Sequence, residues 1–112
     1  MLILAFKFVI GHAAADFVLQ PTAMARGKNR HLVMETLEGQ KNVLFWPYWM
    51  SAHALVHGGI VWFISGNPVM GLAEFVLHWI IDFAKCERWT RIHIDQLLHM
   101  ICKAVYIFLL LR

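Results

Sequence analysis

The sequence has 112 residues, of which 60% are hydrophobic and 15% charged, with a net charge of +3 and a mean hydropathy of +0.59. It is too short for two ordinary domains and too apolar for an ordinary soluble one. The positive charge is a weak indication of nucleic-acid binding, and we expect no nucleic-acid partner because the basic residues lie in short loops between apolar stretches. The prediction is a single all-α integral membrane domain covering residues 1–112.

Four apolar stretches are candidates for membrane-spanning helices. A helix rises about 1.5 Å per residue, so crossing roughly 30 Å of hydrocarbon takes about 20 residues. The predicted spans are residues 2–20, 44–65, 69–84 and 92–111, of which the third is short, and residues 21–43 form a polar loop. The predicted fold is therefore a four-helix transmembrane bundle.

The basic residues predict which way this bundle faces. They lie between the first two spans and between the last two, at Arg26, Lys28, Arg30, Lys41, Lys85, Arg88 and Arg91. Cytoplasmic loops of membrane proteins carry an excess of Lys and Arg. We therefore expect both basic loops in the cytoplasm and both termini outside, in a multi-pass protein of the bacterial cytoplasmic membrane. Lys7 and Lys103 fall within spans, where a lysine is costly unless it snorkels or faces a partner.

Each predicted span carries one pair of polar residues four positions apart. The pairs are His12 with Asp16, His53 with His57, His78 with Asp82, and Asp95 with His99. This spacing places both side chains of a pair on one face of a helix. Ionisable residues inside a membrane are costly, and they usually mark a functional site. The four pairs therefore predict one shared site inside the bundle.

The depth of each pair within its span indicates whether the pairs can meet. Counted from the cytoplasmic ends, the pairs of the first, third and fourth spans agree within one turn, and His53 lies near them. His57 is one turn deeper by this count, and an isolated packing role is as good an interpretation of it as ligation. The shared level lies roughly 5 to 12 Å below the cytoplasmic surface, at about 1.5 Å per residue.

The residue types indicate a transition metal. Imidazole nitrogen and carboxylate oxygen together suit zinc best, with manganese or iron as alternatives, whereas calcium and magnesium favour oxygen ligands alone. The four pairs supply eight possible ligands, which is more than the four that a tetrahedral metal ion needs. Either two ions are bound about 3.5 to 4 Å apart, or some of the eight orient a ligand histidine through its other nitrogen.

A purely structural role is the alternative to a metal. In that interpretation, Asp16, Asp82 and Asp95 are salt-bridged to Lys7, Lys85 and Lys103 and hold the helices together. Glu74, one turn from His78, is expected near the outer interface rather than in the site. Small residues such as Gly11, Gly58 and Gly59 are expected to permit close helix approach.

Four phrases of the sequence carry a family resemblance: HAAADFVLQ at 12–20, SAHAL at 51–55, HWIIDFAK at 78–85 and DQLLH at 95–99. Together they resemble, in order and over nearly the whole chain, the DUF3307 family of small bacterial and phage membrane proteins. A more distant likeness is to the YdjM-type membrane-bound metal-dependent hydrolases. The resemblance implies a small helical membrane protein, but a shared fold does not establish a reaction.

The function predicted from these observations is a metal-dependent hydrolase with its site in the cytoplasmic half of the bundle. A bound ion would activate water, Asp16 or Asp95 would act as general base, and Lys85 would meet an anionic headgroup or phosphate. Membrane lipids surround the protein, and a lipid-linked or phosphorylated substrate follows from the depth of the site. A homo-oligomer is not required.

Two other functions remain open from the sequence. One is a proton or metal-ion conduit, which would need polar groups continuing toward the outer side. The other is a non-enzymatic phage membrane factor, acting in superinfection exclusion or as a lysis accessory, in which a structural metal or a polar network fastens the bundle.

Overall fold

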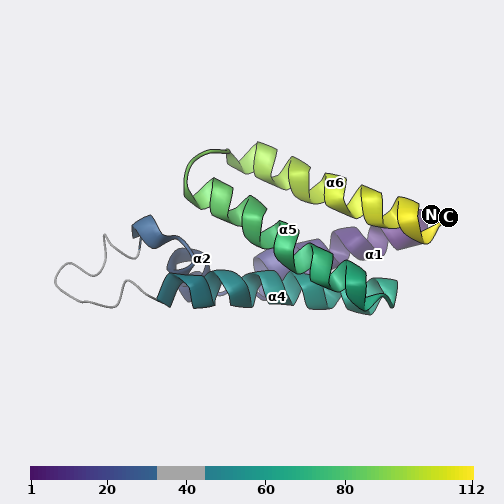
Figure 1. The fold of residues 1–112 in the computed structure, drawn as a ribbon, viewed down its shortest axis with the longest axis horizontal. Helices are drawn as coiled ribbons and strands as arrows, with labels where there is room; N and C mark the ends of the chain where they lie inside the picture. Colours follow the sequence, from purple (N-terminus) through teal and green to yellow (C-terminus); the bar gives the residue numbers. More distant parts are fainter. Residues whose placement is uncertain (33–44) are drawn as a thin grey trace.

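The computed structural model describes residues 1–32 and 45–112, and this part of the chain is helical throughout, with short connections. The elements are α1 (Leu2–Ala13), the π-helical turn η1 (Ala14–Val18), α2 (Thr22–Gly27), α4 (Trp46–Ser65), α5 (Pro68–Cys86) and α6 (Ile92–Leu110). Figure 1 shows the four long segments packed along one direction. The prediction of an all-α fold is confirmed.

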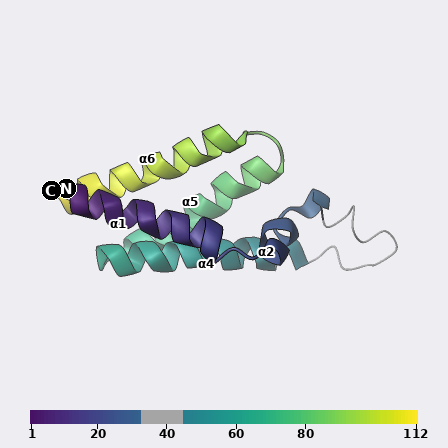
Figure 2. The same ribbon diagram turned by 180° about the vertical axis from the view of Figure 1, so that it is seen from behind.

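The long helices correspond closely to the four predicted spans. α1 continued by η1, and then α4, α5 and α6, begin and end within two residues of the predicted bounds. Figures 1 and 2 show both termini at one end of the bundle, with α2 and the connection from α5 to α6 at the other. Within the predicted polar loop, residues 22–27 form α2, and residues 33–43 lie outside the described residues.

The hairpin between α4 and α5 is specified by three consecutive residues. Gly66 ends α4 with φ of 68°, a left-handed conformation that favours glycine. Asn67 then caps α5, since its side-chain oxygen accepts hydrogen bonds from the backbone N–H groups of Val69 at 2.9 Å and Met70 at 3.4 Å. Pro68 occupies the first turn, where its missing N–H costs nothing.

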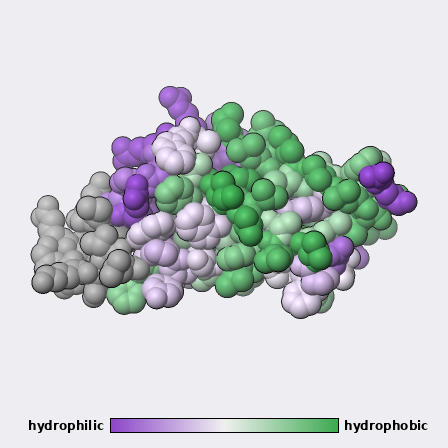
Figure 3. Space-filling view, in the orientation of Figure 1, coloured by the Kyte–Doolittle hydropathy of each residue, from purple (hydrophilic) through white to green (hydrophobic). Residues whose placement is uncertain are grey.

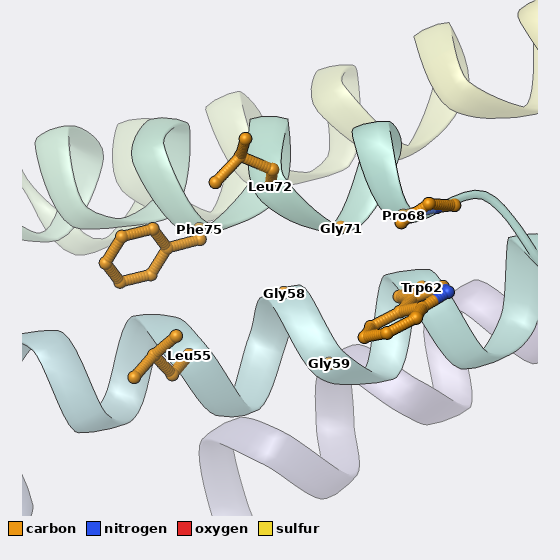
Figure 4. A pocket seen from close by; sticks show the side chains of 8 residues that line it. All are labelled: Leu55, Gly58, Gly59, Trp62, Pro68, Gly71, Leu72 and Phe75. Carbon is orange, nitrogen blue, oxygen red and sulfur yellow. The ribbon is translucent and has the colours of Figure 1, made fainter.

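α4 and α5 approach most closely where two glycines face each other. A Cβ atom added at Gly58 would lie 2.7 Å from the carbonyl oxygen of Gly71, and one at Gly71 would lie 2.7 Å from Cβ of Trp62. Figure 4 shows Gly58 and Gly71 opposite each other across the two helices, beside an apolar groove. Small residues at such a crossing allow the backbones to pack closely.

Replacing Gly71 by Ala is expected to destabilise the bundle by about 1–3 kcal/mol, because overpacking forces the backbones apart. Thermal unfolding in detergent, followed by circular dichroism, measures this change. The matched control is Gly59→Ala on α4, next to Gly58, where an added Cβ meets no atom within 4 Å. Equal stability of the two variants would show that the crossing is not tight.

The distribution of apolar side chains is inverted relative to a soluble protein. Seven apolar side chains are buried among the described residues, and three of them, Phe8, Val61 and Tyr106, form a cluster. Large apolar side chains on all four long segments are instead exposed, including Phe6, Phe17, Phe63, Val69 and Phe108. Figure 3 shows this apolar surface along the bundle, with polar residues gathered toward the end that carries the α5–α6 connection.

One helix meets the requirements of a membrane span by its own length and composition. Among the described residues this helix is α6, Ile92–Leu110. α4 and α5 are of similar length, 20 and 19 residues, but their polar residues lower their mean hydropathy. Those polar residues, among them His53, His57, His78 and Asp82, are buried between the helices rather than exposed on the outer surface.

Candidate metal centre

The eight residues of the four pairs come together at one level of the bundle. They are His12 and Asp16 from α1 and η1, His53 and His57 from α4, His78 and Asp82 from α5, and Asp95 and His99 from α6. All are buried except Asp16, which is partly exposed. The imidazole rings of His57, His78 and His99 stack, with centroids 3.6 Å and 4.2 Å apart. The repeated spacing of four therefore brings these side chains together.

Asp16 lies on the π-helical turn and is surrounded by histidines. Its carboxylate oxygens lie 2.9 Å from Nε2 of His57, 3.2 Å from Nε2 of His12 and 3.4 Å from Nε2 of His53. The side-chain amide of Gln20 donates to the backbone carbonyl of Asp16 at 3.1 Å. π-turns within α-helices are frequent at functional sites. Here the turn holds a partly exposed carboxylate against three imidazoles.

Asp82 is the most heavily contacted group of the cluster. Its carboxylate accepts hydrogen bonds from the ammonium groups of Lys28 and Lys85. Three Nε2 atoms also face it, at 3.3 Å for His99, 3.4 Å for His53 and 3.7 Å for His78. Two ammonium groups and three imidazole rings therefore surround this one buried carboxylate.

Asp95 and Gln96 connect the start of α6 to the rest of the cluster. Asp95 accepts a hydrogen bond from Lys85 at 3.1 Å and lies 3.6 Å from Nε2 of His99. The side-chain amide of Gln96 donates to Asp95 at 3.1 Å and to Asp16 at 3.3 Å. These bonds place the two candidate general bases on either side of one amide.

Glu74 and Lys103 belong to the cluster, although the sequence analysis assigned Glu74 to the outer interface. Both side chains are buried. Their ammonium and carboxylate form an ion pair, and Oε1 of Glu74 lies 3.3 Å from Nδ1 of His78. The expectation was wrong because the spacing of four continues for one more turn on both helices. On α5 it runs from Asp82 through His78 to Glu74. On α6 it runs from Asp95 through His99 to Lys103. The same periodicity in the sequence could have predicted that Glu74 and Lys103 belong to the cluster.

Lys28 is a further residue that sequence reasoning missed. It follows α2 and reaches the buried carboxylate of Asp82. The close contact of Gly27 with Trp49 fixes α2 on the first turns of α4, since a Cβ at Gly27 would lie 2.5 Å from Cδ1 of Trp49. No local pattern in the sequence marks Lys28, because its contact depends on how α2 packs.

Arg30 fastens the same segment at the surface. Its guanidinium donates to both carboxylate oxygens of Glu87, at 2.6 Å and 2.8 Å. These hydrogen bonds lower the pKa of the Glu87 carboxyl below its usual value. Together with Lys28, Arg30 holds the segment after α2 against the end of α5.

The depth count placed His57 one turn too deep, and the structure corrects this. His57 contacts Asp16 and stacks on His78 at the centre of the cluster. The first turns of α4 extend beyond η1 and pack against α2 (Figure 2). Residues further along α4 therefore lie level with the other pairs.

The predicted lysine partners are only partly those found. Lys85 does contact Asp82 and Asp95. Lys103 pairs with Glu74 instead of an aspartate, and Lys7 is exposed on α1, in a groove shared with α4.

Several buried atoms of the cluster are suited to hold a metal ion. Ligand atoms of Asp16, His53, His57 and His78 lie within 4.8 Å of one another. Nε2 of His53 and Nε2 of His78 are buried and make no hydrogen bond, although carboxylate oxygens lie 3.4 Å and 3.7 Å from them. The two other groupings are Glu74 with His78 and His99, and Asp82 with Asp95 and His99. Lysines already neutralise the carboxylates of those two groupings, so the first grouping is the one best suited to a cation.

A pocket of about 290 Å³ leads to the cluster. Its walls are Asp16, Phe17 and Gln20 from η1 and the residues that follow it, Lys85 from α5, and Ile92 and Gln96 from α6. The pocket therefore reaches Asp16, a member of the best-suited grouping, and the ammonium group of Lys85. The cluster is buried, but it is accessible from this side.

Comparison with known families matches residues 4–111 to the profile described as "Protein of unknown function (DUF3307)". The chain belongs to the DUF3307 family. The match covers all four phrases on which the resemblance rested and all residues of the cluster. No curated protein and no solved structure matches the chain. The activity of this DUF3307 member must therefore be argued from its own side chains.

Proposed function

We propose that this DUF3307 protein is a multi-pass protein of the bacterial cytoplasmic membrane that acts as a metal-dependent hydrolase. The observation that carries the proposal is the pocket beside Asp16, which joins the outside to the grouping with unpartnered imidazole nitrogens. A purely structural cluster needs no such opening. A hydrolase needs one for substrate and water.

Three features support the membrane part of the proposal. Exposed large apolar side chains cover all four long segments. Both termini lie at one end of the bundle (Figures 1 and 2), and α2 and the α5–α6 connection, with Arg26, Arg88 and Arg91, lie at the other. The positive-inside rule assigns the basic end to the cytoplasm. α4 and α5 fall short of span-like hydropathy because of side chains that face the bundle interior, where polar groups are tolerated in membrane proteins.

The charges of the cluster favour one divalent ion over two. Four buried or partly buried carboxylates, at Asp16, Glu74, Asp82 and Asp95, face three ammonium groups, at Lys28, Lys85 and Lys103. One divalent cation leaves the cluster close to neutral, whereas two leave a large positive charge in a site of low dielectric. The imidazole-rich ligand set suits zinc, with manganese or iron as alternatives.

The remaining side chains have distinct roles in this proposal. When bound, zinc supplies a water ionised near neutral pH and polarises a carbonyl or phosphoryl oxygen. Asp16 lines the pocket and is placed to accept a proton, whereas Asp95 is fully buried behind Lys85 and Gln96. Glu74 holds Nδ1 of His78, which directs the free Nε2 toward Asp82 and the ligand grouping.

Metal content tests the proposal directly. Detergent-purified wild-type protein is expected to contain about one zinc per chain by elemental mass spectrometry, because the charge balance favours one ion. His78→Ala and His53→Ala, which remove ligands of the best-suited grouping, should reduce that content. The matched control, His93→Ala, removes an exposed histidine from α6 and should retain the metal. A folded, metal-free wild-type protein would contradict the hydrolase proposal.

A second function is favoured by the lysines themselves. Lys28, Lys85 and Lys103 already neutralise most of the carboxylates, so the network could fasten the bundle of a non-enzymatic phage membrane factor. Asp16→Asn separates the two, because loss of the carboxylate of the ligand grouping should abolish hydrolysis, whereas a bundle fastened by the lysine ion pairs should persist. The conduit receives less support: beyond Glu74 and Lys103 the interior becomes the apolar cluster of Phe8, Val61 and Tyr106.

A further inference from the structure

The pocket beside Asp16 lies on the side of the bundle where η1 faces the start of α6, near the end that carries the α5–α6 connection. Figures 1 and 2 show α1 and α6 side by side near the termini and diverging toward η1 and the start of α6. The pocket lies where they have separated, with η1 on one side and Ile92 and Gln96 on the other. In the proposed membrane orientation this side of the bundle faces lipid.

The walls of the pocket have two chemical parts. Asp16, Gln20, Lys85 and Gln96 supply polar groups toward the cluster, and Phe17 and Ile92 supply apolar ones. Phe17 is 81% exposed and Ile92 is 54% exposed, so both extend outward from the pocket. A small soluble substrate has no use for such an apolar margin. An amphiphile, with a polar head and apolar chains, matches both parts.

The polar part favours an anionic head. Lys85 contributes the ammonium group among the pocket residues, and 25% of its side chain is exposed. It uses two of its three N–H donors on Asp82 and Asp95, which leaves one for a ligand. The side-chain oxygen of Gln20 is buried without a partner, so it can accept a hydrogen bond from a head hydroxyl.

The position of the pocket agrees with the depth of lipid phosphates. It lies at the end of the bundle that carries exposed Arg88, Trp89 and Arg91. Aromatic and basic side chains of this kind settle at the headgroup level. A phosphate at that level is therefore close to Lys85 without leaving the membrane.

From these observations we infer that the pocket admits a phospholipid sideways from the bilayer. The phosphate faces the ammonium group of Lys85, and the acyl chains lie along Phe17 and Ile92. The inference rests on the proposed function, because it names the substrate class of the same site. It predicts that lipid contacts at Phe17 depend on the headgroup, whereas contacts elsewhere on the apolar surface do not.

Photo-crosslinking from two positions tests this. The photoreactive residue benzoylphenylalanine replaces Phe17 in one variant and Phe63 in the other. Phe63 is the matched control because it is an equally exposed phenylalanine, at 89%, on α4. Each protein is placed in phosphatidylcholine vesicles with a minor fraction of phosphatidic acid. Position 17 should capture phosphatidic acid several-fold above its share of the lipid, and position 63 in proportion to that share.

Two further arms make the result specific. Lys85→Met should remove the enrichment at position 17, whereas Lys7→Met, an exposed lysine on α1, should not. Excess inorganic phosphate should leave the enrichment unchanged, and loss of enrichment with phosphate would instead indicate a site for free phosphate. Equal lipid composition at both positions overturns the inference. The crosslinking is repeated after a chelator has removed any bound metal, and the enrichment at position 17 should persist. Lipid binding is thus tested apart from metal binding, so a failure of the hydrolase proposal can be told from a failure of this inference.

Discussion

Replacing Lys103 by Met is expected to lower the free energy of unfolding by about 3–5 kcal/mol, because removing one partner of a buried ion pair leaves the other charge unpaired. The partner is Glu74, which is buried beside His78 and has no other lysine or arginine in contact among the described residues. Unfolding in detergent, followed by circular dichroism, measures the loss.

A paired substitution separates the charge from the packing. Lys103→Met combined with Glu74→Gln removes both charges and should recover much of the lost stability, since neutral isosteres of a buried pair are often well tolerated. Lys7→Met is the control for removing an exposed lysine, and it should change stability little. If Lys103→Met is as stable as this control, the pair does not hold α5 to α6.

Asp82→Asn is expected to have an effect of similar size, about 3–5 kcal/mol, because it leaves buried cationic donors without their anion. The substitution keeps the shape of the side chain but removes the charge that Lys28 and Lys85 contact. α2 and Lys28, which follows it, should also loosen. Backbone hydrogen exchange across residues 22–28 should therefore accelerate, as read by mass spectrometry.

The control for this prediction removes a surface contact of the same segment, the one between Arg30 and Glu87. Glu87→Gln weakens the exposed contact with Arg30 and should affect stability much less, since exposed ion pairs contribute little. Combining Asp82→Asn with Lys28→Met should restore part of the stability by removing the stranded ammonium group. Unchanged exchange in Asp82→Asn would mean that Lys28 does not anchor the segment.

Much of the fold could be predicted from the sequence because two independent patterns agree. Apolar stretches of the right length give the four long segments, and the spacing of four gives the inward face of each one. The short turn at Gly66 and Asn67 confirms where α4 ends and α5 begins. These features are local, so they need no knowledge of how the helices cross.

The parts that could not be predicted depend on packing between segments. His57 lies at the same depth as the other pairs because α4 extends beyond η1. The lengths of the apolar stretches do not predict this offset between the helices. Lys28 enters the cluster because α2 docks on Trp49, a contact between residues distant in the chain. Glu74 lies one turn from His78, and its position along the span alone favoured the outer interface, because its pairing with Lys103 depends on how α5 packs against α6.

The ion pair of Glu74 with Lys103 has a consequence for biogenesis. The two residues are 29 positions apart, so a ribosome completes the helix that holds the carboxylate before it makes the partnering amine. A lone acidic group partitions poorly from the translocon into lipid. For a membrane-inserted chain, we therefore expect α5 to enter the bilayer together with α6, as one hairpin.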